Sequence, residues 1–126
     1  MGKTVSLSKD EFCRKVVDIS QPGQQWIFNG RKPAVVDFFA SWCGPCRALA
    51  PLIDRFAADY SGRVDIYKVD VDAESELAEA FGVRSVPTLL FARPGGRPHV
   101  ITGLQPADTL KSMIEKLLEP APAAMG

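Results

Sequence analysis

Cysteine is scarce in this chain of 126 residues: there are three, a small and odd number for a fold held together by disulfides. No apolar run approaches the roughly 20 residues of a membrane-spanning helix, so we expect no membrane partner. The 15 basic and 15 acidic residues balance, which removes the electrostatic argument for binding nucleic acid. A glycine-rich nucleotide-binding fingerprint is also missing. These absences leave a globular chain with few reactive side chains.

The length is that of a single domain. We expect the domain to occupy residues 1–118 and a disordered, Pro/Ala-rich tail to occupy residues 119–126, because chain ends of this kind are seldom tied down. The first ten residues contain no apolar segment of the secretory type. Together with the few cysteines, this predicts a cytoplasmic protein, with the periplasm left open in case a leader has been removed.

Apolar patterning alternates between strand and helix periods, which predicts an α/β fold. The expected order is β-α-β-α-β-α-β-β-α, a central mixed sheet with helices on both faces. The expected helices span about residues 9–18, 44–60, 74–81 and 107–118, and the expected strands about residues 5–7, 34–40, 64–71, 88–92 and 99–102.

The most informative stretch is an apolar strand that runs into Cys43-Gly44-Pro45-Cys46 and then into a helix. A Cys-x-x-Cys pair at a strand-to-helix junction is typical of a redox dithiol. The first turn of a helix offers free N–H groups and a positive dipole end, which stabilise a thiolate and lower its pKa. The pattern therefore predicts a thiol–disulfide oxidoreductase.

Three further residues carry hypotheses. Asp37 interrupts the apolar strand before the cysteines; either it reaches water at a strand end or it is a buried proton acceptor with a raised pKa, and we favour the second. Lys68, in the next strand, is either a solvated lysine or one that leans toward Asp37. Pro87 marks the start of a strand, because proline cannot donate to a ladder, and it is a candidate cis peptide.

A zinc site is the rival interpretation, with Cys13, Cys43, Cys46 and His99 as four ligands. One Cys-x-x-Cys pair with two distant ligands is a weak metal pattern, so we expect no metal. Cys13, on the first helix, is instead expected to be a small buried hydrophobe; a regulatory role would require it to be exposed.

The segment Trp42-Cys43-Gly44-Pro45-Cys46 resembles the active-site motif of the thioredoxin family, in its longer bacterial form. The likeness covers about residues 33–118 and includes Asp37-Phe38, Lys68-Val69-Asp70 and Val86-Pro87-Thr88. The resemblance implies that Cys43 attacks and must be reachable, that Cys46 resolves, and that Asp37, Lys68 and a cis Pro87 assist. It also implies an apolar patch where protein substrates dock, formed by Trp42, Gly44, Pro45, Val86, Pro87, Gly103 and Leu104.

The same resemblance implies a direction of electron flow. Members with Gly-Pro between the cysteines are reductants, so the expected substrates are disulfide-containing client proteins, and the expected electron donor is an NADPH-dependent thioredoxin reductase. The implied protein is a monomer with no bound cofactor. The alternative is a binding module or chaperone-like partner that uses the same apolar surface, with redox turnover incidental. Two departures from the family are Phe39, where tryptophan is frequent, and a longer segment over residues 21–32.

Overall fold

The structure is a computed structural model that describes residues 2–19 and 26–119. The predicted tail, apart from Glu119, lies outside the described residues, and so does part of the longer segment over residues 21–32. No helix in the described ranges is long and apolar enough to cross a membrane.

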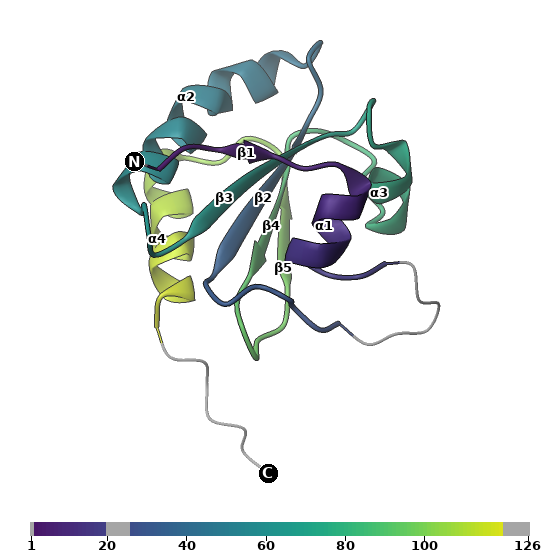
Figure 1. Cartoon of the computed structure of the whole chain (residues 1–126). Coiled ribbons are helices and arrows are strands. Elements are labelled where there is room, and N and C mark those ends of the chain that lie inside the picture. Colours follow the sequence, from purple (N-terminus) through teal and green to yellow (C-terminus); the bar gives the residue numbers. More distant parts are fainter. Residues whose placement is uncertain (1, 20–25, 120–126) are drawn as a thin grey trace.

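The described chain contains one five-stranded mixed sheet, with strand order β1-β3-β2-β4-β5 (Figure 1). β2 pairs in parallel with β3 and antiparallel with β4, which in turn pairs antiparallel with β5. The central strand β2 is nearly completely buried, as its continuous apolar run predicts for a strand covered on both faces. The strands are β1 (Val5–Ser6), β2 (Ala34–Phe39), β3 (Asp65–Asp70), β4 (Thr88–Ala92) and β5 (His99–Thr102).

Helices cover both faces of this sheet, which confirms the predicted α/β class. α2 and α4 lie on one face, and α1 and α3 lie on the other (Figure 1). Each face has its own apolar core, one built around Leu49, Ile53 and Leu110 and the other around Phe12, Phe38 and Leu77. The helices are α1 (Lys9–Lys15), α2 (Gly44–Asp59), α3 (Ser75–Ala80) and α4 (Ala107–Leu117).

The first helix is shorter than the sequence predicts. Its start is as expected, since Ser8 and Glu11 form a capping box. Its end comes at Lys15 rather than near residue 18, and Asn29 donates hydrogen bonds to two carbonyl groups at that end. The Asn29 side chain donates to the Cys13 carbonyl at 2.9 Å, and its backbone N–H donates to the Val16 carbonyl at 2.8 Å.

Cys13 differs from its predicted environment. It lies on α1 as a free thiol that is partly exposed, not buried. Its neighbour Phe12 takes the core position, with no exposed surface. The helix therefore turns Cys13 toward its margin, so the prediction of a buried hydrophobe is wrong.

Candidate dithiol active site

The two cysteines lie at the junction between the end of β2 and the start of α2. Cys43 is the N-cap residue of α2, and its Sγ accepts a hydrogen bond from the backbone N–H of Cys46 at 3.1 Å. Pro45 lies in the first turn, where its missing N–H leaves no helical bond unmade. The two Sγ atoms are joined as a disulfide, with the Cα atoms 5.2 Å apart. The Cys43 sulfur thus lies in the amide field of a helix N-terminus.

Exposure does not separate the two cysteines. Each retains 4% of its accessible surface, so Cys43 is less accessible in this oxidised state than we expected for an attacking group. The residues beside it, Trp42, Gly44 and Pro45, are exposed. What distinguishes Cys43 from Cys46 is therefore its position at the cap of α2 and not its contact with solvent.

Asp37 lies in the middle of β2 and is buried, with 1% of its surface exposed. Its Oδ1 has no hydrogen-bond partner among the described residues. Lys68 is its partner across the β2–β3 pair, so the two side chains emerge on the same face of the sheet. Burial raises the pKa of Asp37 from 3.8 to about 6, and the nearby charge of Lys68 opposes part of that rise. Of the two positions considered for Asp37, the structure has the buried one.

Pro87 comes directly before β4 and is buried, so it is not part of the exposed docking surface, whereas its neighbour Val86 packs against the dithiol. The Val86–Pro87 peptide bond is cis, as the family resemblance implies. The Val86 carbonyl oxygen lies 3.6 Å from Cys43 Sγ; a disulfide sulfur has no hydrogen to donate, so the two atoms meet in van der Waals contact. The Gly103 N–H donates to the Pro87 carbonyl at 2.8 Å with a φ of +95°, a conformation that favours glycine.

The predicted docking residues gather around this end of the sheet. Trp42 is 67% exposed and Leu104 is 53% exposed, so both present apolar surface to solvent. The indole Nε1–H of Trp42 donates to the carboxylate of Asp72 at 2.8 Å. Sequence reasoning missed Asp72, because no local pattern links it to a residue 30 positions earlier. Only the sheet, which ends β2 and β3 side by side, brings the two together.

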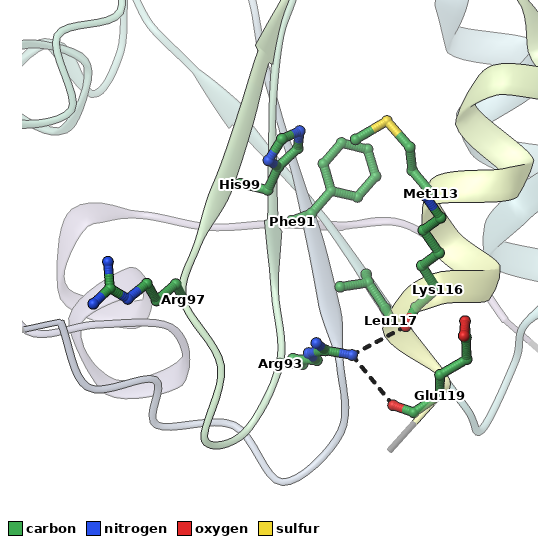
Figure 2. A pocket seen from close by; sticks show the side chains of 8 residues that line it. All are labelled: Phe91, Arg93, Arg97, His99, Met113, Lys116, Leu117 and Glu119. Carbon is green, nitrogen blue, oxygen red and sulfur yellow. Dashed lines mark hydrogen bonds between the residues drawn. The ribbon is translucent and has the colours of Figure 1, made fainter. Parts of the chain in front are cut away.

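A hollow in the surface lies elsewhere, between the β4–β5 hairpin and α4 (Figure 2). Its volume is about 570 Å³. It lies near the C-terminal end of β4, whereas Pro87 precedes the N-terminal end of that strand. Arg93 crosses it and donates to the carbonyl oxygens of Lys116 and Glu119 at 3.1 and 3.2 Å, which satisfies the C-terminal end of α4 (Figure 2). Neither cysteine of the disulfide lines this hollow, and Asp37 does not line it either, so it is not part of the dithiol site.

The rival zinc interpretation has no geometric support. Among the described residues, no three His, Cys, Asp or Glu side chains are grouped so as to hold a metal ion. Cys13 lies on α1 and His99 on β5, in different elements from the dithiol.

A Cys-x-x-Cys disulfide at the start of the helix that follows the central strand of a mixed sheet is typical of proteins that carry out dithiol–disulfide exchange. The chain belongs to the thioredoxin family: the family profile "Thioredoxin" matches residues 4–116. It is accordingly a thiol–disulfide oxidoreductase.

Individual relatives agree with this assignment. A thioredoxin of Borreliella burgdorferi is 39% identical over 111 residues, which cover 88% of this chain and 94% of the relative. An M-type chloroplastic thioredoxin of Spinacia oleracea is 37% identical over 118 residues, covering 93% of this chain and 65% of the relative. Thioredoxin 1 of a Nostoc species is 38% identical over 95 residues, covering 75% and 89% respectively.

Proposed function

We propose that this protein reduces disulfides in client proteins, with Cys43 as the attacking group and Cys46 as the resolving group. The observation that carries the proposal is the N–H of Cys46 directed at Cys43 Sγ at the start of α2. In the dithiol state the same amide and the aligned helix dipole stabilise a thiolate at Cys43, which lowers its pKa and makes it nucleophilic.

The reaction proceeds by two thiol–disulfide exchanges. The Cys43 thiolate attacks one sulfur of the client disulfide; that S–S bond breaks, a mixed disulfide forms, and the second client sulfur leaves as a thiolate. Cys46 then loses its proton and attacks Cys43 Sγ, which releases the first client sulfur. Two electrons have passed from the dithiol to the client, and the protein is left with the Cys43–Cys46 disulfide.

Asp37 is the proposed acceptor of the Cys46 proton, reached through water. Its raised pKa supports this role, because a carboxylate that titrates near 6 exchanges protons near neutral pH more readily than one near 3.8. Lys68 limits the rise and thereby keeps part of the population ionised. The Val86 carbonyl oxygen lies 3.6 Å from Cys43 Sγ, and Pro87, which follows Val86, is proposed to hold this backbone where a client segment can meet it.

The docking surface comprises exposed or half-exposed groups around Cys43, and its apolar character suits an unfolded or extended client segment. Trp42 and Leu104 offer the largest exposed areas. The proposed docking residues are Trp42, Gly44, Pro45, Val86, Gly103 and Leu104.

The dithiol is restored in this proposal by an NADPH-dependent thioredoxin reductase. NADPH and flavin belong to that partner, and this chain, acting as a monomer, carries no resident cofactor. The cytoplasm is the proposed compartment, because a reductant of this kind needs a supply of electrons.

Two experiments test the proposal. Cys46→Ser should accumulate mixed disulfides between Cys43 and client proteins, whereas Cys13→Ser, the matched control, should turn over normally. If Cys46→Ser traps nothing while Cys43 still reacts with an alkylating agent, the assigned roles are wrong. If Cys43→Ser keeps full activity in the reduction of insulin disulfides, the reductase proposal fails and binding alone would remain.

Direction is tested by an equilibrium titration against glutathione. Reference potentials for thioredoxins and for strong periplasmic oxidants differ by about 150 mV. A reduction potential of about −270 mV supports the proposal. A reduction potential of about −120 mV would make the protein an oxidant instead.

A further inference from the structure

Besides its position next to Asp37, Lys68 contacts the aromatic ring of Phe39. Its Nζ lies 4.6 Å from the centroid of the Phe39 ring, within the range of a cation–π interaction. In the part of the chain that the structure describes, Lys68 joins no ion pair within 4.0 Å; the pairs there are Lys9–Glu76 and Lys32–Asp65. The ammonium group therefore rests on an aromatic face and not on a carboxylate.

The register of the sheet explains how the ring reaches the lysine. Asp37 and Phe39 are two residues apart on β2, so their side chains lie on the same face. Lys68 pairs with Asp37 and Asp70 pairs with Phe39, so the lysine emerges on that face beside both β2 side chains. The ring and the carboxylate thus flank the lysine from one strand.

Among the residues that the structure describes, Lys68 is the one cation that acts on the titration of Asp37. Desolvation and the charge of Lys68 are the two influences that act on its titration. The strand on its other side, β4, has the apolar residue Leu89 at the paired position. Lys68 is the charge that opposes the effect of burial on the pKa of Asp37, so the position of its ammonium group controls how large that opposing effect is.

Asp70, two residues after Lys68 on the same face of β3, already accepts hydrogen bonds from the backbone. Asp70 Oδ1 accepts hydrogen bonds from the backbone N–H groups of Asp72 at 2.9 Å and Ala73 at 3.3 Å. It is therefore held by the turn after β3, and the ring of Phe39 is the group that meets the ammonium.

We propose that Phe39 is a positioning residue: its ring holds the Lys68 ammonium beside Asp37 and so sets the protonation of the buried carboxylate. The inference rests on the proposed function only for the use of Asp37 as a proton acceptor; the coupling among the three side chains stands apart from turnover. The residue type at position 39 then matters for Asp37, because tryptophan, which is frequent there in the family, binds a cation on its ring face more strongly than phenylalanine does.

The test is a double-mutant cycle between Phe39 and Lys68, in which the pKa of Asp37 is measured. The pKa of its carboxyl group is followed by carbon NMR in the oxidised protein, where no thiol titrates at the dithiol. In Phe39→Leu the ammonium is released toward solvent, and the pKa of Asp37 should rise by about half a unit. Phe39→Trp, the conservative control, should leave it at or below the wild-type value.

The same substitution in a Lys68→Met background should give no further shift, because the charge that the ring positions is gone. An equal rise in both backgrounds would mean that the ring acts on Asp37 without Lys68 and would overturn the proposal. A fall in the pKa of Asp37 would mean that the ring acts by burying the carboxyl group, because burial raises this pKa, and would overturn the proposal too, as would no change with Lys68 present. A readout in the unmodified protein guards against a misfolded variant: the Lys68 ε-methylene protons should show an upfield ring-current shift, and its absence contradicts the contact. None of these measurements uses a client, so loss of reductase activity would not mimic their failure.

Discussion

Asp37→Asn should stabilise the oxidised protein at neutral pH, although it removes a charge from the candidate site. Burial raises the pKa of Asp37 from 3.8 to about 6 in the folded state. At about 1.4 kcal/mol per unit, the wild-type protein loses about 3 kcal/mol of folding free energy as the carboxyl group ionises. Asparagine has nearly the same shape and never ionises, so it escapes this loss.

The direction of the pKa shift determines the pH range over which Asp37 affects stability. The folded-state pKa lies above the unfolded value, so the stability linked to protonated Asp37 is fully present below about pH 3.8 and is lost as the pH rises through about 6. The advantage of Asp37→Asn should therefore be small near pH 4, grow between pH 4 and 6, and level off above about 7.

Urea unfolding of the oxidised wild-type and variant proteins across this range measures the difference, provided that the dependence on denaturant is unchanged. Asp54→Asn, an exposed carboxylate on α2, is the matched control and should show no such growth. A difference that is constant with pH, or a variant that is less stable at pH 8, would refute the reasoning that desolvation dominates at Asp37.

Three other substitutions test different parts of the structure. Phe12→Ala should lower the free energy of unfolding by about 3–5 kcal/mol in urea titrations, because Phe12 is fully buried on α1; a loss below about 1 kcal/mol would contradict that placement. Tyr60→Phe should cost about 1 kcal/mol in the same assay by removing the hydrogen bond from the Tyr60 hydroxyl to the Glu115 carboxylate that ties α2 to α4, and no loss would mean that this contact contributes nothing. Asp72→Ala should raise KM for a protein client about threefold or more with kcat unchanged, since Trp42 would have to be ordered on docking, whereas an unchanged KM would show that Asp72 does not position Trp42.

Local chemistry was enough to predict much of this fold. The strands over residues 88–92 and 99–102 have the predicted limits, because Pro87 and the turn after Ala92 bound the first of them. The dithiol at the start of a helix followed from the position of Cys43-Gly44-Pro45-Cys46 after an apolar strand.

Features that depend on distant partners escaped the sequence. The end of α1 is capped by Asn29, which lies 16 residues beyond the Cys13 carbonyl that it binds. Asp72 reaches Trp42 only because two parallel strands end at the same edge. Asp37 was predicted to be buried, but its position relative to Lys68 depends on the register between β2 and β3, which patterning within one strand does not contain.

The central claim is that a helix N-terminus ionises Cys43, and the most direct measurement is the pH dependence of its alkylation rate. A Cys13→Ser/Cys46→Ser double variant leaves Cys43 as the single thiol, and thiolate absorbance in the ultraviolet gives an independent titration. The account predicts a pKa at least about one unit below the value of about 8.5 for free cysteine. A Cys43 thiol that titrates at about 8.5 would contradict it.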